Sequence, residues 1–445
     1  MRKLEVRSII CLALAAILII GTGVFVFRFV KYGSKWATFY GNRSIYENGV
    51  LKSGAIYDRN DVLLAKSGGG EIKYNDDPEI REATVHAVGD VNGKISTSAL
   101  SAYKDKLIGY NLLTGTYKLK GKNEDLKLTL DADVCKEAYR QLSKYDAGCI
   151  GIYNYKTGEI ICMVSTPTFD PENEPSVSAD DQSGLYMNRF LSSKLPPGSI
   201  FKTVTAAAAI ENTDYQNFSY ECDGTRVIHG EDLNCAYLYP HGHVDLGGAL
   251  LQSCNGAFSV LADEMGPDVM KDYVNRLGLT KSYNIDGIRN VKGSFDFPKD
   301  SELNLGWSGV GQYHDLVNPC SMMVYMGAIA NGGKAAIPHI LMSDFRITKM
   351  TNQMIDESTA EILSGMMKKT VEDAYLGATN LPNLDVYAKT GTAESAGKKP
   401  YGWFAGFLKD ENHPYAFIVC LENSGEAYYT ALPVANSVLQ VAVSK

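Results

Sequence analysis

An uncharged apolar stretch lies close to the N-terminus. From Ser8 to Phe27 the chain carries no charged side chain, and a helix of this length rises about 30 Å, the thickness of a bilayer core. A cleaved signal peptide is the alternative, but its apolar core is normally about 7–15 residues long. The pattern therefore predicts a retained single-pass anchor in the cell membrane. Arg2, Lys3 and Arg7 precede it and favour a cytoplasmic N-terminus with the large remainder outside.

A mixed region follows this stretch, and we expect only short elements in it. Residues 54–65 (GAIYDRNDVLLA) are strand-like, the SGGG run at 67–70 ends the patch, and residues 98–110 have a helical pattern. The region from 32 to 128 is too small and too polar to form an enzyme of its own. It is expected to be a membrane-proximal pedestal that follows the anchor, residues 1–31.

The hydrophobic pattern becomes sharper in the remainder of the chain, residues 129–445. Apolar, β-branched runs typical of strands occupy 149–155, 159–165, 384–394, 402–409 and 415–423. A Lys-Thr-Gly turn at 156–158 joins the first two into a predicted hairpin. Helical patterns cover 131–145, 432–443 and most of 166–383. Because apolar strands must be buried together, we predict an α+β fold. Its five-stranded antiparallel sheet comes from both ends of this region, is flanked by helices and has a helical insert.

Composition and charge exclude two classes of protein. The hydrophobic fraction of 45% and the charged fraction of 21% are ordinary for a globular protein, so a wholly disordered chain is excluded. Residues 32–445 carry 38 Lys and Arg against 50 Asp and Glu, which gives a net charge of −12. A nucleic-acid surface needs concentrated positive charge, so we expect no nucleic-acid partner.

The nine cysteines fall into different groups. Thiols within apolar runs are expected to pack as small buried hydrophobic groups; these are Cys149, Cys162 and Cys420. Cys222 and Cys235 instead bracket the polar segment ECDGTRVIHGEDLNC. We expect these two thiols to lie close together, with a disulfide slightly favoured over free thiols outside the cell. A metal site that includes His229 and Asp232 is the third and least favoured interpretation.

The segment LPPGSIFKTVTAAAAIE at 195–211 holds the most informative residues. Pro-Pro-Gly prevents a helix from running into Ser199, so Ser199 is expected at a helix start, where its N–H can face an anion. Lys202 lies one turn further along the same face. A partly dehydrated lysine has a lowered pKa and can act as a base, which makes the serine hydroxyl a nucleophile. The alternative is a plain serine cap before a helix, and the same spacing recurs at Ser101 and Lys104.

A second serine lies in a Ser-x-Asn triplet. Ser253 and Asn255 follow a helix-like run at a point where the chain turns, and they could offer a hydroxyl and an amide to the same cleft. The same triplet spacing recurs at 282–284. Alone, the triplet is therefore weak evidence for a site.

A Lys-Thr-Gly-Thr run lies on the predicted strand 384–394. The ammonium of Lys389 and the hydroxyls of Thr390 and Thr392 would form an edge that binds a carboxylate, and Gly391 would let a ligand approach the backbone. The other Lys-Thr-Gly copy is the hairpin turn described above. It precedes the Ser-x-x-Lys element, so we do not assign it to the site.

The three elements in this order form a motif of β-lactamases and penicillin-binding proteins. On these residues the chain resembles a class B penicillin-binding protein of the small penicillin-binding protein A type. The resemblance extends over most of the chain after the anchor and includes GAIYDRNDVLLA, YKTGEIICMVSTPTFDP, HGHVDLGGALLQSCNGAF and GWFAGF in the order found in the family. The region before the transpeptidase part is shorter than in larger family members, so their partner contacts cannot be transferred.

The resemblance implies a peptidoglycan D,D-transpeptidase that cross-links D-Ala-D-Ala stem peptides through a serine acyl-enzyme and is inhibited by β-lactams. Ser199 would attack the carbonyl of the penultimate D-Ala, and Lys202 would take its proton. The N–H groups of Ser199 and Thr392 would stabilise the oxyanion. Ser253, with Lys389 nearby, would pass a proton to the departing D-Ala.

The resemblance also implies how the substrate is held and which partners are needed. Asn255 would hold the donor peptide amide, while Thr390, Thr392 and Lys389 would bind the terminal carboxylate. This chemistry requires neither a metal nor an organic cofactor. Glycan polymerisation is expected to need a separate glycosyltransferase partner. A D,D-carboxypeptidase, a β-lactamase or a membrane-tethered β-lactam sensor would share the acylation step, and these functions are the alternatives.

Overall fold

The computed structural model describes residues 2–42, 45–111, 113, 124–178, 183–343, 345–394 and 397–445. The chain divides into two compact units. The first consists of Met1–Ile56, Ala65–Lys73 and Tyr103–Leu126, and the second of Tyr57–Leu64, Tyr74–Ala102 and Lys127–Lys445. Parts of the expected pedestal lie outside the described residues. The expected boundaries after residues 31 and 128 stay predictions.

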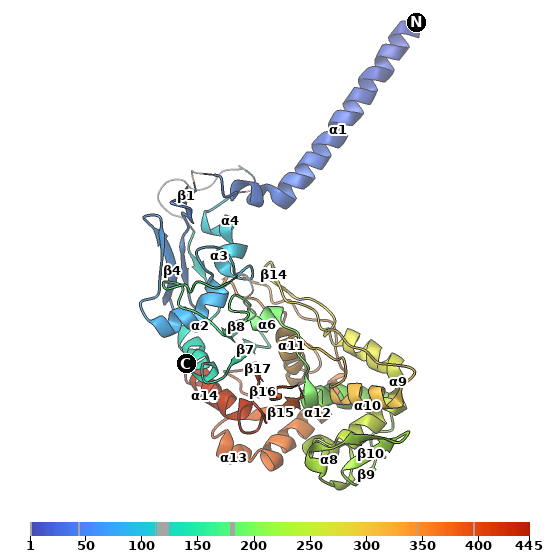
Figure 1. The fold of residues 1–445 in the computed structure, drawn as a ribbon. Helices are drawn as coiled ribbons and strands as arrows, with labels where there is room; N and C mark the ends of the chain where they lie inside the picture. Colours follow the sequence, from blue (N-terminus) through green and yellow to red (C-terminus); the bar gives the residue numbers. More distant parts are fainter. Residues whose placement is uncertain are drawn as a thin grey trace. The chain divides into compact units, whose positions relative to one another are not determined.

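The apolar N-terminal stretch forms a single helix, α1 (Arg2–Ala37) (Figure 1). Lys3–Ala37 is long and apolar enough to cross a membrane, and its most apolar window has a mean hydropathy of 2.9. None of that window is buried inside the protein, as expected where lipid covers the side chains of a helix. The predicted helix is confirmed, and its composition suits a membrane anchor.

Several short strands occur in the following region. β1 (Tyr46–Glu47) pairs with β2 (Val50–Leu51). A four-stranded sheet has the order β5-β4-β3-β6 and consists of β3 (Ala55–Tyr57), β4 (Leu63–Gly68), β5 (Glu71–Tyr74) and β6 (Leu126–Lys127). The strand-like patch at 54–65 is thus two strands, because the Asp58 carboxylate accepts hydrogen bonds from the N–H groups of Asn60 and Val62 and turns the chain.

The helix expected over residues 98–110 is not continuous. Two single turns replace it, α3 (Ala99–Ala102) and α4 (Lys104–Leu107). Between them Tyr103 has a non-helical backbone, with φ −116° and ψ 28°, and its side chain is buried. Apolar spacing alone did not reveal this break.

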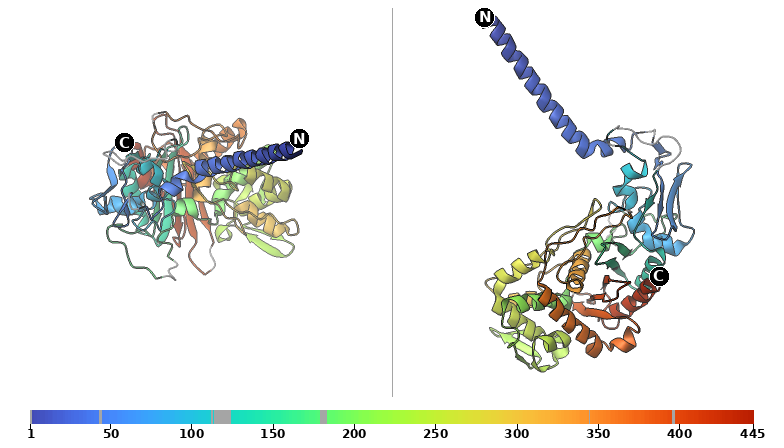
Figure 2. Two further views of the ribbon diagram at one scale, coloured as in Figure 1. Left: turned by 90° about the horizontal axis from the view of Figure 1, so that it is seen from above. Right: turned by 180° about the vertical axis from the view of Figure 1, so that it is seen from behind.

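The second unit is built on the predicted five-stranded antiparallel sheet, which has the order β15-β16-β17-β7-β8. Its strands are β7 (Ala147–Asn154), β8 (Ile160–Thr166), β15 (Val386–Ala393), β16 (Tyr401–Leu408) and β17 (Tyr415–Glu422). β17 pairs with β7 in a register that places Cys420 opposite Cys149. The teal and red strands in Figures 1 and 2 therefore lie side by side although they are far apart in the sequence.

Helices cover both faces of this sheet. Alternate residues of β7 point to opposite faces: Gly148 lies against Leu142 of α5 (Ala132–Leu142), whereas Gly151 lies against Phe190 of α6 (Arg189–Ser192). α14 (Ala431–Val443) packs against α5, and α11 (Pro319–Ala330) packs against β7, β16 and β17. The strands are almost fully buried as a result, which explains their nearly continuous apolar runs.

The segment between β8 and β15 is mainly helical, as predicted. Its larger helices are α7 (Lys202–Asn212), α8 (Leu246–Leu251), α9 (Asn255–Arg276), α10 (Glu302–Val310) and α12 (Glu357–Lys369). α13 (Gly377–Asn380) is a single turn. Three small hairpin-like sheets were not predicted: β9 (Tyr220–Cys222) with β12 (Gly242–Val244), β10 (Thr225–Ile228) with β11 (Glu231–Asn234), and β13 (Asn284–Ile285) with β14 (Ile288–Arg289).

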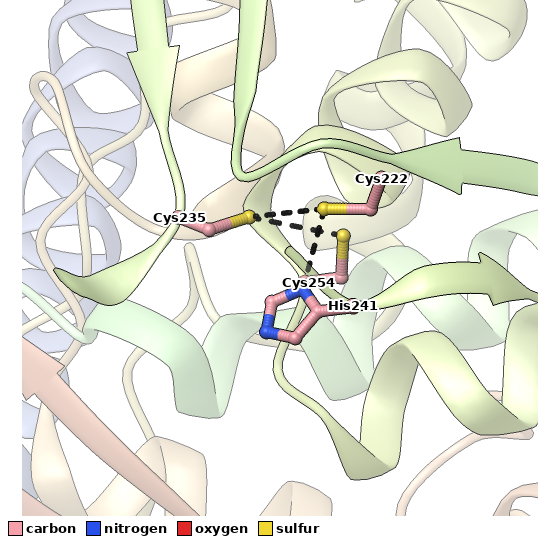
Figure 3. A group of neighbouring side chains, drawn as sticks. All are labelled: Cys222, Cys235, His241 and Cys254. Carbon is pink, nitrogen blue, oxygen red and sulfur yellow. Dashed lines mark hydrogen bonds between the residues drawn. The ribbon is translucent and has the colours of Figure 1, made fainter. Parts of the chain in front are cut away.

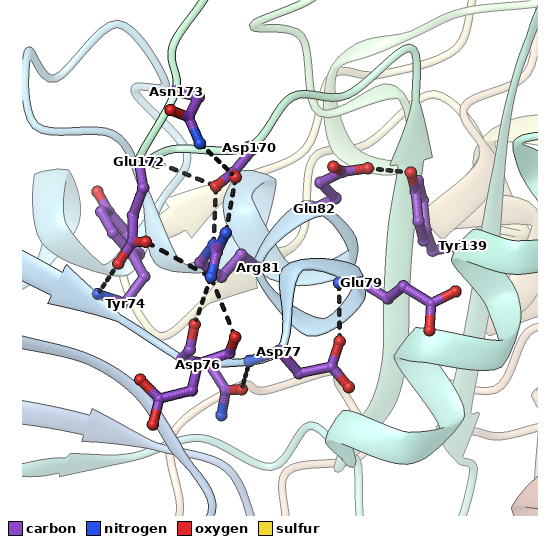
Figure 4. Close-up of polar contacts among 11 residues, drawn as sticks. Tyr74, Asp76, Asp77, Glu79, Arg81, Glu82, Tyr139, Asp170, Glu172 and Asn173 are labelled. Atoms are coloured by element: carbon purple, nitrogen blue, oxygen red, sulfur yellow. Dashed lines mark hydrogen bonds and ion pairs between the residues drawn. The ribbon is translucent and has the colours of Figure 1, made fainter.

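A cluster of ion pairs fixes α2 (Pro78–Val88) within the second unit (Figure 4). The guanidinium of Arg81 binds both carboxylate oxygens of Asp170, each at 2.7 Å, and donates to the carbonyl oxygen of Asn75. Because of this contact the pKa of Asp170 is lowered to about 2. Glu82 accepts a hydrogen bond from Tyr139 of α5. These contacts join α2 to α5 and to the loop that follows β8.

Candidate active site

Ser199 lies on a tight turn immediately before a buried helix. The turn is the 3-10 element η1 (Gly198–Phe201), and α7 begins at Lys202. Ser199 thus lies in the 3-10 turn that precedes the α-helix and not in the α-helix itself. It is half-buried at the edge of a cleft. Gly198 has φ +54°, and a Cβ there would lie 2.6 Å from the carbonyl oxygen of Thr392. The glycine of Pro-Pro-Gly therefore allows the turn to pack directly on strand β15.

Lys202 points to the Ser-x-Asn triplet. Its Nζ donates to the carbonyl oxygen of Ser253 at 2.6 Å, to Ser253 Oγ at 3.1 Å and to Asn255 Oδ1 at 2.6 Å. The hydrogen bonds described for this ammonium thus go to the triplet and not to Ser199. Asn255 also donates from Nδ2 to the carbonyl oxygen of Asn234 at 2.6 Å. Asn255 therefore has its amide oxygen and nitrogen both engaged, and it fixes the position of Lys202.

Lys389 reaches the same serine from the opposite side. Its Nζ donates to Ser253 Oγ at 3.2 Å, to the Tyr375 hydroxyl at 3.3 Å and to the Thr390 carbonyl oxygen at 3.1 Å. Ser253 Oγ therefore lies between two lysine nitrogens. The backbone of Ser253 has φ +54°, the left-handed conformation that is uncommon outside glycine. The sharp turn at this residue aims its hydroxyl at both lysines.

Both lysines are buried without a carboxylate among these partners. Lys202 is 0% exposed and Lys389 is 1% exposed, and their hydrogen bonds go to neutral oxygens. Burial and, to a smaller extent, the positive charge of Lys389 lower the pKa of Lys202 to about 7. Burial alone lowers the pKa of Lys389 to about 7. Either amine can thus exist in its neutral form near neutral pH, as a general base requires.

Strand β15 is the edge strand of the sheet and forms one wall of the cleft. The N–H of Thr390 donates to the Tyr375 hydroxyl at 3.0 Å, so it points away from β16. Because alternate residues of a strand share a direction, the N–H of Thr392 also faces the open edge. We expected Gly391 to leave room for a ligand beside the backbone, but that space is filled by the chain. A Cβ there would lie 2.8 Å from the Pro197 carbonyl oxygen, so this glycine lets β15 contact the turn that carries Ser199.

Tyr375 is a site residue that the sequence did not reveal. It follows the single π-turn η3 (Thr370–Ala374). Its hydroxyl accepts hydrogen bonds from Lys389 and from the Thr390 N–H, and it lies 2.8 Å from Thr390 Oγ1, to which it can donate. Burial raises the pKa of Tyr375 to about 12, so the hydroxyl stays neutral. An irregular turn brings it to the strand, and this placement has no local sequence signal.

Five of the predicted residues line one cleft of about 560 Å³, and Lys202 and Lys389 contact its wall at Ser253. Its lining includes the acidic residues Glu394 and Glu426 together with hydroxyl, amide and aromatic side chains: Ser199, Ser253, Asn255, Thr390, Thr392, Gln252, Gln312, Trp307, Tyr237 and Tyr428. Trp403 of β16 donates its indole N–H to the Pro196 carbonyl oxygen at 2.9 Å and so holds the turn beside Ser199 in place. Three segments that are far apart in the sequence thus supply one hydroxyl-rich and lysine-rich site.

The duplicate motifs lie elsewhere. Lys156 is exposed in the β7–β8 turn, where the Asn154 side chain accepts its backbone N–H, as predicted for the copy that we rejected. Ser282 donates its hydroxyl to the carbonyl oxygen of Asn290. Ser101 belongs to α3 and Lys104 begins α4, so these two residues are not on one helix face. None of these residues lines the cleft.

The positions of the cysteines confirm the expected burial of the apolar-run thiols and the closeness of Cys222 and Cys235, but not the favoured disulfide. Those of the apolar runs, Cys149, Cys162 and Cys420, are fully buried. Cys222 and Cys235 are close, as predicted, with their sulfurs 3.7 Å apart, but both are free thiols, so the favoured disulfide is wrong for this structure. The metal partners considered, His229 and Asp232, lie on the exposed β10–β11 hairpin, and His229 pairs with Glu302. The correct neighbours of the two thiols are His241 and Cys254.

Comparisons with known proteins agree with this geometry. Residues 148–442 match the family described as "Penicillin binding protein transpeptidase domain". The chain is 24% identical over 334 residues to the peptidoglycan D,D-transpeptidase PbpA of Mycobacterium tuberculosis, which covers 66% of this chain and 67% of that protein. It is 26% identical over 369 residues to the stage V sporulation protein D of Bacillus subtilis, which covers 79% of this chain and 53% of the relative.

The fold is shared with solved structures. Penicillin-binding protein A from M. tuberculosis, in its penicillin G acyl-enzyme complex, aligns with a TM-score of 0.77 at 21% identity. The alignment covers 88% of this chain and 99% of that one. The matched family covers the whole five-stranded sheet apart from the first residue of β7, together with all three motifs. The chain therefore belongs to the transpeptidase family of penicillin-binding proteins.

Proposed function

We propose that this protein is a peptidoglycan D,D-transpeptidase in which Ser199 is the acylated nucleophile. The observation that carries the proposal is a cleft lined by Ser199 and by Ser253, whose hydroxyl accepts hydrogen bonds from two buried lysines. Relatives in the family are named peptidoglycan D,D-transpeptidases, and solved relatives are β-lactam acyl-enzyme complexes. The substrate class is therefore stem peptides that end in D-Ala-D-Ala, with β-lactams as inhibitors.

Lys202 is proposed as the base that activates Ser199. It lies at the start of α7, directly after the turn that carries the serine, and is held by Ser253 and Asn255. In its neutral form it has a lone pair that can accept the hydroxyl proton, and full burial favours that form. Asn255 acts here by orienting the lysine, and it also lines the cleft toward the donor peptide.

The oxyanion is proposed to bind between the N–H groups of Ser199 and Thr392. The turn with Ser199 packs on β15 at Gly198 and Gly391, which brings the two backbones together. The Thr392 N–H faces the open side of the edge strand, so it does not donate to a neighbouring strand of the sheet. Preorganised amide donors of this kind typically contribute about 10²–10³-fold to a rate.

Ser253 and Lys389 are proposed to return the proton to the leaving D-Ala. Ser253 Oγ contacts both lysine nitrogens, so a proton taken by Lys202 can pass through the hydroxyl to the side of Lys389. The hydroxyls of Thr390 and Thr392 face the cleft and would hold the terminal carboxylate with Lys389. An acceptor amine or water then attacks the acyl-enzyme and releases Ser199.

The cellular arrangement is also a proposal. The basic residues before the apolar helix favour a cytoplasmic N-terminus, which puts the transpeptidase unit on the outer side, where peptidoglycan lies. Because the matched family describes only a transpeptidase domain, glycan strands would be polymerised by a separate glycosyltransferase partner. An assay with this protein alone therefore has to supply the donor stem peptides.

Cross-linking activity tests the function directly. Purified full-length protein in detergent should convert stem peptides ending in D-Ala-D-Ala, with an amine acceptor, into a cross-linked product and free D-Ala. Mass spectrometry of the products measures both. Trimmed peptide without any cross-link would mean a D,D-carboxypeptidase, and a stable acyl-enzyme without turnover would mean a β-lactam sensor.

Substitutions at Ser199 and Lys202 should have unequal effects on labelling by a fluorescent penicillin. Ser199→Ala should abolish the adduct, because the attacking hydroxyl is gone. Lys202→Ala should slow labelling by about 10²–10⁴-fold, the usual contribution of a general base. Lys202→Arg should be nearly as slow, because guanidinium stays protonated. Peptide mapping locates the adduct, and an adduct on Ser101 or Ser253 would contradict the assignment.

The two Lys-Thr-Gly copies provide a matched comparison. Lys389→Ala should slow penicillin acylation by roughly 10²-fold or more, because the buried contact to Ser253 is lost. Lys156→Ala changes an exposed turn and should leave the rate nearly unchanged. Stopped-flow labelling of the two variants measures the difference. Equal rates would show that the wrong copy was assigned to the site.

Tyr375→Phe tests the residue found only in the structure. Loss of its hydroxyl should slow acylation by about 10–100-fold, since a hydrogen bond to a charged group contributes roughly 1.5–3 kcal/mol. Tyr155→Phe is the matched control, because that buried hydroxyl donates to the Leu408 carbonyl oxygen away from the cleft. The control should lower the melting temperature and leave the rate unchanged. If both variants lose only stability, Tyr375 has no part in positioning Lys389.

A further inference from the structure

Four potential metal ligands converge next to the Ser-x-Asn triplet. Cys222, Cys235, His241 and Cys254 offer one ligand atom each, and these atoms all lie within 4.8 Å of one another (Figure 3). The residues come from the end of β9, the chain after β11, the loop before β12 and the start of α9. The three cysteines are nearly fully buried.

Strand pairing explains how these distant residues meet. Cys222 is opposite Gly242 across β9 and β12, which places the neighbouring His241 beside it. The N–H of Cys235 donates to the carbonyl oxygen of Gly224 at 2.9 Å, so the chain returns close to Cys222 after the β10–β11 hairpin. The cluster therefore holds together a small lobe, residues 220–244, that consists of two two-stranded sheets.

The spacing of the ligand atoms matches a tetrahedral metal centre. With Zn–S near 2.3 Å and Zn–N near 2.0–2.1 Å, the edges of the tetrahedron are about 3.8 Å between sulfurs and about 3.6 Å between sulfur and nitrogen. In the protein the Cys222 and Cys235 sulfurs are 3.7 Å apart, and the Cys235 and Cys254 sulfurs are 3.8 Å apart. Cys222 Sγ lies 3.3 Å from His241 Nδ1.

Other interpretations account for fewer of these facts. A disulfide joins only two sulfurs at about 2.05 Å and leaves the third thiol and the imidazole without a role. Thiols that pack only as hydrophobic groups do not need a histidine nitrogen aimed at them. Three sulfurs and one imidazole nitrogen around a common centre are the ligand set of structural zinc sites.

We propose that Cys222, Cys235, His241 and Cys254 form a structural Zn²⁺ site with all four positions filled by protein. On binding, the three thiols release their protons to solvent and the thiolates bind the metal. His241 would bind the metal through Nδ1, which faces the cluster, and would carry its proton on Nε2. With no open position, the ion does not contact substrate and takes no direct part in the serine chemistry of the cleft.

The site adjoins the cleft, because Cys235 and His241 also line it, and Cys254 connects the site to the residues that hold Lys202. Cys254 lies between Ser253 and Asn255, the two residues that bind Lys202. Its sulfur also accepts the N–H of Ala257 and caps α9. On the other side, Cys235 follows Asn234, whose carbonyl oxygen accepts the Asn255 amide. The metal thus fixes both chain segments that hold Asn255, and the sharp turn at Ser253.

Metal content tests the site independently of activity. Full-length protein purified under reducing conditions from zinc-supplemented cells should retain about one zinc per chain by mass spectrometry of the metal. Replacement by Co²⁺ should give the thiolate-to-cobalt charge-transfer band and the intense visible bands of a tetrahedral site. Protein without bound zinc, or a disulfide between Cys222 and Cys235 in protein purified without reductant from the same zinc-supplemented cells, would overturn the proposal.

Two histidines that lie two residues apart provide a matched pair. His241→Ala removes a ligand and should weaken zinc binding by more than about 100-fold, since even the loss of a group that only supports a ligand costs 10–100-fold. His243→Ala removes an exposed imidazole of the same lobe and should retain the zinc. Cys222→Ser should lose zinc as His241→Ala does, whereas Cys11→Ser in α1 should not. Equal zinc content in His241→Ala and His243→Ala would overturn the ligand set.

The effect on the cleft rests on the proposed function and has its own readout. Removal of zinc from the wild-type protein with a strong chelator should slow penicillin labelling at least about tenfold, and added Zn²⁺ should restore it. An unchanged rate after complete removal would overturn the connection through Cys254. Failure of the proposed function would look different, because zinc-loaded protein would then carry no penicillin adduct at Ser199.

Discussion

Two buried ammonium groups that share one serine hydroxyl are the constraint on which the rest of the structure depends. Lys202 and Lys389 both donate to Ser253 Oγ, and neither has a carboxylate among its described hydrogen-bond partners. Two positive charges this close, away from water, repel strongly. The site therefore favours a state in which one amine is neutral, and under the proposed function that neutral amine would be the base. The fold must hold three distant segments together against this repulsion, and the sheet and the helical insert do so.

Glycine contacts and one indole hydrogen bond hold the turn that carries Ser199 on the sheet. Gly198 faces the Thr392 carbonyl oxygen and Gly391 faces the Pro197 carbonyl oxygen, so each glycine removes the side chain that would separate the turn from β15. Trp403, on the next strand, binds the carbonyl oxygen of Pro196. Both glycines that the sequence places in the motifs therefore act in backbone packing. A larger residue at either position would widen the gap between the Ser199 and Thr392 amides.

Much of the fold and of the candidate site could be predicted from the sequence, because the local hydrophobic pattern of these segments agrees with their burial in the structure. The five strands could be predicted from their apolar runs, and Ser199, Lys202, Ser253 and Lys389 from ordered motifs. Tyr375 could not, since it reaches Lys389 through an irregular π-turn whose geometry depends on tertiary packing. The sequence interpretation that grouped His229 and Asp232 with the two thiols was wrong for a related reason. His229 is near Cys222 in sequence, but the β10–β11 hairpin points it to solvent, whereas strand pairing brings His241 to the thiol.

The middle position of the Ser-x-Asn triplet would allow the proposed metal site and the proposed serine mechanism to share one turn. Ser253 adopts a left-handed backbone, so the residues on either side of Cys254 send their polar atoms toward Lys202 while the Cys254 sulfur lies in the cluster on the other side. Left-handed backbone at a residue with a side chain is strained and persists only when its surroundings fix it. A metal bound through the next residue would supply that restraint directly at the turn. Cys254 has no part in the proposed serine mechanism. A metal ligand at this position would therefore stabilise the turn without replacing a residue that the proposed reaction needs.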